Sequence, residues 1–600
     1  MNLVNFVKPP LDPKWLLPWA RHWLRPTGTT ALVGLAVLVG LGTGLVAVIF
    51  TWLVESAREI FFGYSRELLT RGFSFDWRYW VPVVPLVGGL LVGPIVYKFA
   101  REARGHGVPE VMDAVARRGG IIRPRVALAK AVASAICIGS GGSAGREGPI
   151  VQIGSAIGSV IGQRFKMSAS LVKILVGCGA AAGISAVFNA PIAGVFFSLE
   201  VILGDFGIGT FAPVILASVV ASLVSHAMLG NYPAFSIPIY KLVSAWEIPL
   251  YAVLGVLAAL VARLFVRTLY KGEDLFEKLG LPGWTKPAVG GLMLGFLGLA
   301  FPQVFADGYS TITQVLAGQG VFGLLAVLLF AKILATSLTL GSGNSGGIFA
   351  PSLFMGTALG GAFGHLVHTL FPEVTASSGA YAVVGMGAVV AAATHAPMTA
   401  FMIIFEMTRD YHIILPLMVA CVIATMIALR MAPDSIYTRK LLRRGIVLRQ
   451  GRDVNVLAQH MVSEVMRRDF DTIPVNMHLS DILHKLEETR QSSFLVVDAE
   501  GLLVGILGFQ DLRTLLTKPG LDTLVIASDI MHPVRQVVFP DDRLTEVWDL
   551  FRPDEVGAVP VVERAHDRRI AGIIRREDIT RFYNQRLVES LTPEGPTIGR

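Results

Sequence analysis

Apolar runs dominate the chain from about Thr29 to about Met431, and the pattern then changes abruptly to that of a soluble protein. Shorter runs, such as Ile150–Ile161 and Ile348–Leu359, are interrupted by glycines. A mixture of complete and partial spans is typical of transporters and channels, so the pattern predicts a multi-pass α-helical membrane protein. The runs that reach or approach the roughly 20 residues needed by a membrane-crossing helix are Ala31–Val54, Val81–Val96, Pro213–Leu229, Pro249–Leu264, Val321–Leu340 and Leu415–Met431.

Two glycine-rich stretches occur at equivalent places in the two halves of this apolar region. They run from Gly139 to Pro149 and from Gly341 to Pro351, and their glycines, serines and proline match at an offset of 202 residues. Corresponding interruptions in two halves of a membrane protein indicate a midplane binding site built from broken helices. Helix starts there would direct free backbone N–H groups and positive dipole ends at one ligand, which favours an anion.

The repeat extends beyond these stretches, which supports two homologous halves. Transporter precedent suggests that the halves are inverted, although the sequence does not show this. The four-residue spacing of Gly154, Gly158 and Gly162 predicts close helix packing and not ligand contact. A second matching series, at an offset that drifts from 208 to 206, pairs Gly177, Asn189 and Glu200 with Gly385, His395 and Glu406.

The region after the last apolar run contains its own repeat. We interpret Arg439–Asp453 as a basic linker, after which Val462–Met466 recurs as Ala527–Met531 and Ser493–Asp498 recurs as Ala558–Glu563. Each unit alternates short β-branched runs with an amphipathic helix, so two small α/β modules are expected. The predicted helices are Leu479–Thr489 and Leu544–Phe551.

Composition and charge narrow the class of protein. The chain is 53% hydrophobic and 16% charged, and its net charge of +8 is concentrated in basic clusters such as Lys98–Arg104, Arg117–Arg125 and Arg439–Arg444. The positive-inside rule assigns these clusters to the cytoplasmic face, which explains them better than nucleic-acid binding does. We find no cleavable signal peptide, no phosphate-binding loop, no metal-ligand cluster and no nucleophile triad, so no enzyme is expected. The cysteines, interpreted as packing residues, are Cys137, Cys178 and Cys421.

Three short motifs follow one another along the apolar region: Gly-Arg-Glu-Gly-Pro149, Asn-Ala-Pro191 and Gly-Gly-Ile-Phe-Ala-Pro351. Together and in this order they resemble the CLC family of chloride channels and proton/chloride antiporters, and the tail resembles a pair of cystathionine-β-synthase (CBS) domains. The resemblance covers about residues 28–585. It implies the CLC fold of two inverted repeats of full and partial helices, with a cytoplasmic α/β CBS pair. It also implies a homodimer with one pore per subunit in the inner or plasma membrane, and both termini in the cytoplasm.

The resemblance also implies domain boundaries. They are a cytoplasmic N-terminal segment 1–27, a transmembrane anion-permeation domain 28–447, a linker 448–460, CBS domains 461–518 and 526–585, and a C-terminal tail 586–600.

Glu147 is the first candidate for a functional residue. A carboxylate at bilayer depth is energetically costly, so its presence there indicates a functional site. By resemblance it is the outer gate: ionised, it occupies an anion position and blocks the path, and protonation releases it. The alternative is a carboxylate stabilised by a helix dipole. The resemblance assigns anion coordination to the backbone N–H groups of Arg146, Glu147 and Gly148 in one half and of Ile348, Phe349 and Ala350 in the other.

Two further residues are carried over from the family. Tyr437 matches a tyrosine whose hydroxyl reaches the central chloride from inside, and its alternative role is that of an interfacial aromatic. Lys130 matches a lysine near the inner pore, which would raise the local anion concentration. The alternative for Lys130 is an ordinary positive-inside lysine.

Three departures from the family pattern bear on function. His106 replaces the serine that donates to the central anion; either its imidazole contributes an N–H, or only its backbone matters. Val201 occupies the position of the antiporters' inner proton-transfer glutamate and cannot carry a proton. Glu200 and Glu406 are interpreted as structural.

The CBS units keep two aspartates that contact ribose in nucleotide-binding pairs, Asp511 and Asp578, but lack the Ser/Thr three residues earlier, having Gly508 and Arg575.

These features favour a chloride channel that conducts passively and is gated by protonation of Glu147, within a family of voltage-gated channels. The alternatives are a proton/chloride antiporter with an atypical inner proton route, an exporter of fluoride or nitrate, and a membrane-anchored nucleotide sensor. No cofactor or metal is required. Adenine-nucleotide binding at the CBS pair stays open beside a purely structural, dimer-stabilising tail.

Overall fold

The computed structural model describes residues 29–64, 80–235, 237–238, 240–446, 460–489, 493–508, 511–512, 524–534, 536–548, 550–551, 558–564 and 566–589. The chain divides into two compact units, Met1–Gly451 and Arg452–Arg600. The predicted segment 1–27, nearly all of the predicted linker 448–460 and most of the predicted tail 586–600 lie outside the described residues.

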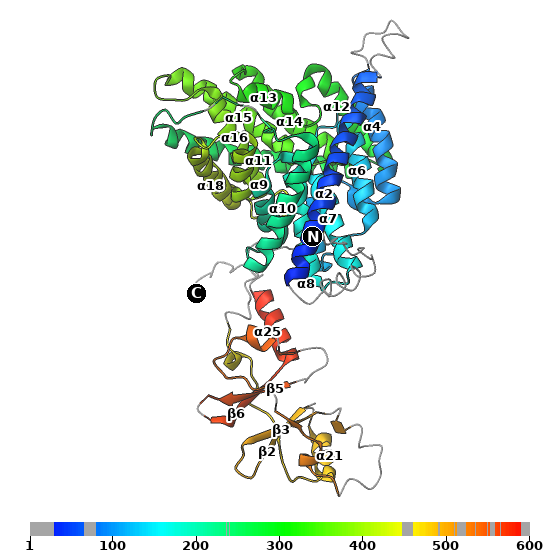
Figure 1. Ribbon diagram of the computed structural model, residues 1–600, viewed down its shortest axis with the longest axis vertical. Helices are drawn as coiled ribbons and strands as arrows, with labels where there is room; N and C mark the ends of the chain where they lie inside the picture. The colour runs from blue at the N-terminus through cyan, green and yellow to red at the C-terminus, as the bar shows by residue number, and fades with distance from the viewer. Residues whose placement is uncertain are drawn as a thin grey trace, which may run out of the picture. The chain divides into compact units, whose positions relative to one another are not determined.

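The described part of the first unit is built of helices joined by loops, most of them α-helices (Figure 1). Short π-helices continue three elements, at Glu59–Tyr64 (η1), Ile95–Phe99 (η3) and Ser198–Leu203 (η5). The α-helices are α2 (Thr29–Arg58), α4 (Val83–Pro94), α5 (Val108–Arg117), α6 (Pro124–Gly139), α7 (Glu147–Arg164), α8 (Ala169–Phe188), α9 (Pro191–Phe197), α10 (Ile208–Leu229), α11 (Glu247–Lys278), α12 (Lys286–Ala300), α13 (Tyr309–Leu316), α14 (Phe322–Gly341), α15 (Phe349–Leu370), α16 (Ser378–Thr394), α17 (Pro397–Thr408), α18 (Ile414–Met431) and α19 (Thr438–Leu442).

Six helices in the described part of the chain are long and apolar enough to cross a membrane. Five of them, namely α2, α10, α11, α14 and α18, correspond to predicted runs, whereas α8 was not predicted. The run Val81–Val96 forms only a short α-helix that continues as a π-helix, and it counts among the shorter apolar helices. The run Pro249–Leu264 lies within a helix of 32 residues, because its polar continuation to Lys278 keeps a helical pattern of buried residues.

The two glycine-rich stretches form helix breaks, as predicted. Helix α6 ends at Gly139 and α7 begins at Glu147, while α14 ends at Gly341 and α15 begins at Phe349. In both glycine-rich stretches the third residue is a glycine in the left-handed region, with φ of 94° at Gly141 and 102° at Gly343. An L-residue with a side chain rarely adopts this conformation, which explains why glycine recurs at both places.

The glycine spacing within the helices serves packing, also as predicted. A Cβ atom at Gly158 would lie 2.0 Å from the carbonyl oxygen of Leu175, so α7 and α8 approach each other backbone to backbone. At the equivalent contact, a Cβ at Gly360 would lie 2.1 Å from the carbonyl oxygen of Tyr381, between α15 and α16. Each broken helix is therefore held tightly by the helix that follows it.

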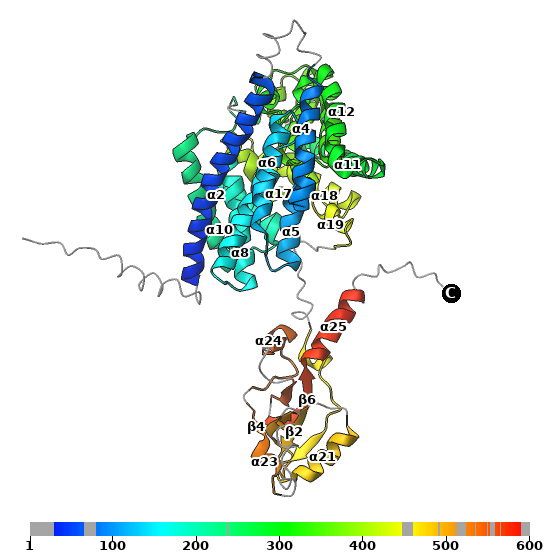
Figure 2. The ribbon, with the colours of Figure 1, turned by 90° about the vertical axis from the view of Figure 1, so that its right-hand side faces the viewer.

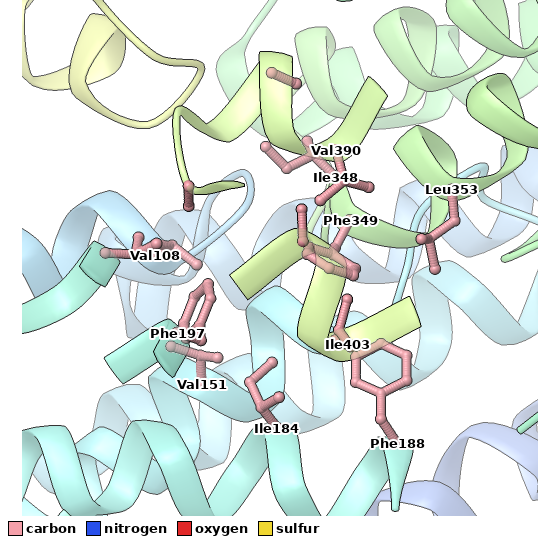
Figure 3. Packing of buried hydrophobic residues seen from close by; sticks show 14 of the residues in the cluster. Val108, Val151, Ile184, Phe188, Phe197, Ile348, Phe349, Leu353, Val390 and Ile403 are labelled. Atoms are coloured by element: carbon pink, nitrogen blue, oxygen red, sulfur yellow. The ribbon is translucent and has the colours of Figure 1, made fainter. Parts of the chain in front are cut away.

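Bulky side chains fill the centre of the first unit (Figure 3). Phe349, the first residue of α15, packs with its ring centroid 5.8 Å from that of Phe188 at the end of α8. All three cysteines are buried, which confirms their interpretation as packing residues. The start of α15 therefore lies within the core, where the N–H groups of its first turn can bind a ligand in a buried site.

The interpretation of Arg439–Asp453 as a linker needs correction at its start. Residues 438–442 form helix α19, in which Leu441 is buried and Lys440 is 7% exposed. The apolar residues Ile436, Leu441 and Ile446 pack into the core. The sequence interpretation overlooked them because basic residues dominate the composition of this segment. Residues 447–459 lie outside the described part of the chain.

The second unit is an α/β fold with two sheets (Figure 2). In one sheet, β1 (Thr472–Pro474) pairs parallel with β2 (Ser493–Val497), and β3 (Leu503–Gly508) and β4 (His532–Pro533) follow in antiparallel order. In the other, β5 (Ala558–Glu563) pairs antiparallel with β6 (His566–Arg575). The helices are α21 (Leu479–Glu488), α23 (Ala527–Ile530), α24 (Leu544–Trp548) and α25 (Arg576–Glu589).

Two hydrophobic cores of the second unit are each formed mainly by one repeat and completed by the start of the other, with Val462 in the core of the second repeat and Ala527 in that of the first. A third cluster joins the two repeats. Leu495 and Leu503 of the first repeat pack in one buried cluster with Ala558, Val562 and Ile573 of the second. The two α/β modules expected from the sequence are therefore present and associate through their strands. Helix α21 matches its prediction to one residue, and α24 ends three residues before its predicted end.

Candidate anion-permeation site

Three loops from distant parts of the chain meet at the helix breaks. Gly145 and Gly347 exchange both backbone hydrogen bonds, at 2.9 and 2.7 Å, in an antiparallel bridge between the two halves. The N–H of Gly105 donates to the carbonyl of Asn344 at 3.0 Å, which adds the loop before α5. An antiparallel contact between equivalent residues is the arrangement that an inverted pair of repeats produces.

Glu147 lies at this junction, buried to 1% exposure. Its Oε2 is 3.4 Å from the backbone nitrogen of Ala350, in the first turn of α15. Its Oε1 accepts a hydrogen bond of 2.9 Å from the hydroxyl of Tyr309. The carboxylate of one half thus lies at the helix start of the other half, where an anion is favoured by the free N–H groups and the helix dipole.

The residues assigned to anion coordination are brought together at the two helix starts. In the first turn of a helix, N–H groups lack partners within the helix, so those around Glu147 and Phe349 are available to a ligand. The backbones leave no room for larger residues: a Cβ at Gly148 would lie 2.2 Å from the carbonyl oxygen of His106. The assigned residues at these starts are Arg146, Glu147, Gly148, Ile348, Phe349 and Ala350, of which all except Arg146 are buried.

His106 is buried and belongs to an aromatic group at the same junction. Its ring centroid is 5.8 Å from that of Tyr437, and its Nε2 is 3.5 Å from the hydroxyl oxygen of Tyr270. The Tyr270 hydroxyl itself donates to the carbonyl of Ile436 at 2.6 Å. Nδ1 of His106 is buried without a hydrogen-bond partner, so the ring has a nitrogen to offer to a ligand.

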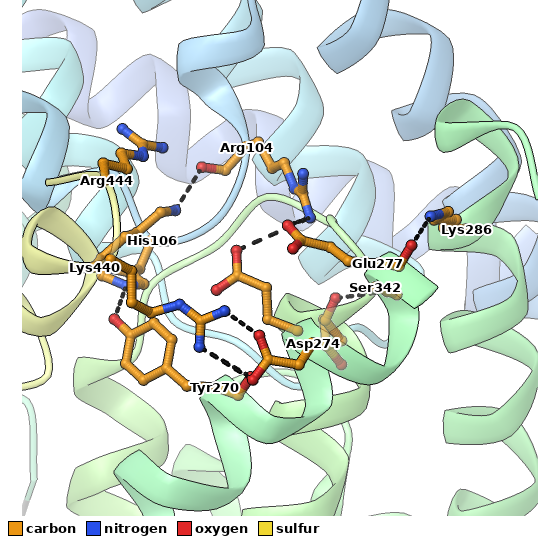
Figure 4. Close-up of polar contacts among 12 residues, drawn as sticks. Arg104, His106, Tyr270, Asp274, Glu277, Lys286, Ser342, Lys440 and Arg444 are labelled. Carbon is orange, nitrogen blue, oxygen red and sulfur yellow. Dashed lines mark hydrogen bonds and ion pairs between the residues drawn. The ribbon is translucent and has the colours of Figure 1, made fainter. Parts of the chain in front are cut away.

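Charged side chains surround this aromatic group (Figure 4). The Lys440 ammonium group is 3.5 Å from the carbonyl oxygen of Arg104. Arg104 also lies 3.6 Å from Glu277, and Arg444 pairs with Glu110 at 2.6 Å. Sequence reasoning missed Tyr270 and Lys440, because neither belongs to a motif and both reach the site only through the fold.

Lys130 is fully buried, which excludes an ordinary positive-inside surface lysine. Its ammonium group donates to the carbonyls of Ala103 at 3.0 Å and Gly105 at 2.6 Å. Lys332, exactly one repeat offset further along, is also fully buried and donates to Val304 at 3.0 Å and Ala306 at 2.9 Å. We call Ala103–Gly107 the His106 loop and Val304–Gly308 the Asp307 loop. The offset of 202 could have revealed Lys332 from the sequence alone.

The Asp307 loop borders a cavity of about 1210 Å³. Arg146, Asp307 and Tyr309 line this cavity, and the Arg146 guanidinium lies 3.3 Å from the Asp307 carboxylate. Neither Asp307 nor Tyr309 belongs to a motif recognised in the sequence. Tyr309 connects the cavity to Glu147 through its hydroxyl, and Asp307 contacts Arg146 and the N–H of Tyr309.

Glu200 and Glu406 are structural, as interpreted. Glu200 accepts hydrogen bonds from the backbone nitrogens of Met398 and Thr399 at the start of α17, at 3.2 and 2.8 Å. Glu406 accepts from Ile192 and Ala193 at the start of α9, at 2.9 and 2.7 Å. Each half therefore caps a helix of the other. Val201, beside Glu200 in η5, is buried at 2% exposure.

In the second unit, the aspartates considered for ribose binding already have partners. Asp578 is 7% exposed, and its Oδ1 accepts bonds from Nε and Nη2 of Arg467 at 3.0 and 2.7 Å. The hydrogen bonds to Asp578 raise the pKa of Arg467. Asp511 accepts from the backbone nitrogen of Gly508 at 2.8 Å and lies 2.9 Å from His532.

Comparisons with known proteins agree with this geometry. A family model for voltage gated chloride channels matches residues 88–429, and a CBS domain model matches residues 462–518 and 527–585. Chloride channel protein CLC-e of Arabidopsis thaliana is 31% identical over 622 residues, covering 91% of this chain and 86% of the relative. The H(+)/Cl(-) exchange transporter ClcA of Salmonella agona is 34% identical over 424 residues, covering 69% of this chain and 88% of the relative.

Solved structures show the same fold. A slow cyanobacterial Cl-/H+ antiporter superimposes with a TM-score of 0.63 at 28% identity, covering 69% of this chain and 97% of the other. A eukaryotic CLC transporter superimposes with a TM-score of 0.59 at 23% identity, covering 91% of this chain and 97% of the other.

The fold and the site therefore define a multi-pass membrane protein that transports anions. The chain belongs to the CLC family of voltage gated chloride channels and transporters, and it carries a C-terminal pair of CBS domains.

Proposed function

We propose that the protein conducts chloride passively and that protonation of Glu147 gates the path. The observation that carries this proposal is the position of the Glu147 carboxylate, 3.4 Å from the Ala350 nitrogen at the helix start of the other half. An ionised carboxylate there takes the place of an anion. Protonation removes its charge and weakens its attraction to the N–H groups, so chloride can replace it.

Passive conduction is supported by the aliphatic side chain of Val201. Coupled exchange requires a titratable group that takes protons to the gate from the other side, and valine has none. In the described structure the position is also buried, at 2% exposure, in the π-helix η5 beside the structural Glu200.

The second candidate function is proton/chloride antiport. It is favoured by the exchange activity named for ClcA of Salmonella agona and by the likeness to the slow cyanobacterial antiporter. His106 offers this chain a titratable group at the junction, with Nδ1 free and Nε2 directed at Tyr270. In this alternative, His106 or a chain of water molecules carries the protons that the inner glutamate would otherwise carry.

The reversal potential of the chloride current under a pH gradient distinguishes the two candidates. For the full-length protein in liposomes, passive conduction predicts a reversal potential that follows the chloride gradient and ignores the pH gradient. A potential displaced by the pH gradient in a fixed ratio would establish antiport instead.

In Glu147→Gln, whose side chain mimics the protonated gate, we expect flux that no longer depends on pH. Retained pH dependence would remove Glu147 from the mechanism.

We further propose that the protein acts as a homodimer in the inner or plasma membrane, with both termini and the CBS domains in the cytoplasm. Apolar side chains on α10 and α18 support burial against lipid or a second copy: Ile208 is 91% exposed, Leu223 60% and Leu415 65%. An enzymatic role has no support in the site, whose polar groups are suited to holding an anion. Fluoride or nitrate remains a candidate substrate beside chloride because of His106.

A further inference from the structure

Tyr309 is the side chain that joins the large cavity to the buried Glu147. It is the first residue of α13, it lines the cavity, and its hydroxyl donates to Oε1 of Glu147 at 2.9 Å. Its ring lies edge-on to Phe235, with centroids 5.4 Å apart and planes at 73°. Phe235 is itself buried to 1% exposure, so the tyrosine ring has a fixed wall on one side.

The backbone that carries Tyr309 is braced at several points. Asp307 accepts the N–H of Tyr309 at 3.3 Å through Oδ1, and its Oδ2 lies 3.3 Å from Arg146, the residue next to the gate. Lys332 holds the carbonyls of Val304 and Ala306. Gly308 adopts φ of 78°, a left-handed conformation suited to glycine, and this turn directs α13 at the site. The position of the hydroxyl is therefore set by the Asp307 loop.

The strength of the Tyr309 bond depends on the charge of its acceptor. Hydrogen bonds to an ionised carboxylate are roughly twice as strong as those between neutral groups. The other charged or titratable groups that act on this carboxyl are Arg146, Asp307, Lys332 and Tyr437. Arg146 and Asp307 are paired with each other, and Lys332 is engaged with backbone carbonyls. Tyr309 is thus a direct side-chain donor that can be removed without changing any charge around the gate.

We propose that Tyr309 is a positioning residue that holds the ionised Glu147 in the blocking position and releases it on protonation. The proposal rests on the function proposed above for Glu147. It adds the group that sets how much acid is needed to open the path. With the hydroxyl present, the ionised, blocking form is stabilised. Without it, protonation occurs at higher pH and the path opens more readily near neutrality.

The test is the pH dependence of chloride flux in liposomes containing full-length Tyr309→Phe, which lacks only the hydroxyl. We expect the midpoint of the pH curve to move up by about one pH unit, a tenfold change in proton affinity. Flux near neutral pH should rise several-fold, up to about tenfold. Phe235→Leu, which loosens the ring without changing charge or hydrogen bonds, should move the midpoint in the same direction by less.

Tyr381→Phe is the matched control. Its hydroxyl also donates to a buried carboxylate, Glu247 at 3.0 Å, between α16 and α11. This variant should keep the wild-type midpoint, whereas a shift as large as that of Tyr309→Phe would mean that any buried hydroxyl has this effect and would overturn the proposal.

The double variant Glu147→Gln/Tyr309→Phe separates the two proposals. If Glu147→Gln is insensitive to pH and the double variant behaves the same, the tyrosine acts through the gate. If Glu147→Gln is insensitive but Tyr309→Phe follows the wild-type curve, the role of Tyr309 is wrong and the gate stands. If Glu147→Gln keeps its pH dependence, the gate proposal fails and the role of Tyr309 fails with it.

Discussion

The His106 loop and the Asp307 loop occupy equivalent places in the two halves and share the same backbone arrangement. In each, a fully buried lysine donates to two carbonyls: Lys130 to Ala103 and Gly105, and Lys332 to Val304 and Ala306. In each, a glycine with a left-handed φ, 81° at Gly107 and 78° at Gly308, leads into a short helix.

The side chains on these two loops differ. Where one loop has His106, the other has Asp307, which pairs with Arg146; where one helix begins with Val108, the other begins with Tyr309. The repeat therefore conserves the scaffold within the chain and varies the chemistry. One loop presents an imidazole ring with an unpartnered Nδ1, and the helix that follows the other loop presents a hydroxyl to Glu147.

The largest effect is expected from a substitution that gives the His106 loop the carboxylate of the Asp307 loop. His106→Asp would place a buried carboxylate where we expect the anion to bind, and we predict at least a tenfold loss of chloride flux at neutral pH, because the negative charge repels and replaces the anion. His106→Asn, a neutral residue of similar size, should retain most of the flux. Flux assays in liposomes compare them, and equal flux in both variants would show that the side chain lies outside the path.

The shared scaffold predicts equal losses of stability in the two halves. Lys130→Met and Lys332→Met each leave two buried carbonyls without their donor, which should lower the free energy of unfolding by about 3 kcal/mol. Lys278→Met, at the exposed end of α11, is the control and should change stability by less than about 0.5 kcal/mol. Thermal unfolding in detergent measures all three, and a loss confined to one lysine would contradict the equivalence of the loops.

A smaller effect is expected on selectivity. His106→Ser exchanges a ring for the hydroxyl that the family usually has, and we predict a several-fold shift of relative permeability from nitrate toward chloride. A serine hydroxyl is a compact donor, whereas the imidazole N–H is set further from the backbone. Reversal potentials under mixed-anion gradients give the ratio. An unchanged ratio would mean that only the backbone at residue 106 matters.

The smallest effect is expected for nucleotide binding at Asp511 and Asp578, the equivalent aspartates of the two repeats of the second unit. Arg467 occupies Oδ1 of Asp578, which is only 7% exposed, and His532 contacts Oδ1 of Asp511, so a ribose would have to compete with these partners. We therefore expect no saturable heat when ATP, ADP or AMP is titrated into the full-length protein. A binding isotherm would show that these pairs open, and Arg467→Ala should then strengthen binding.

The sequence predicted the helix breaks and their pairing, and it singled out Glu147, because glycines, prolines and a carboxylate in apolar surroundings are strong local signals; the role of Glu147 as the gate stays a prediction. It also predicted the structural roles of Glu200 and of the glycines at four-residue spacing. It misjudged the start of the linker, where the basic residues of α19 concealed buried apolar neighbours. It overlooked Tyr309 and Tyr270, since a tyrosine in an apolar chain has no distinctive spacing.

The sequence by itself determined that two equivalent halves each place a broken helix in the membrane. Local chemistry suffices for this, because a glycine-rich interruption followed by proline ends one helix and begins another. Only the tertiary structure decided which side chains meet at the break. Glu147, Tyr309 and Ala350 are brought within hydrogen-bonding distance from three separate helices. Such contacts depend on how the two halves pack against each other, which no local pattern specifies.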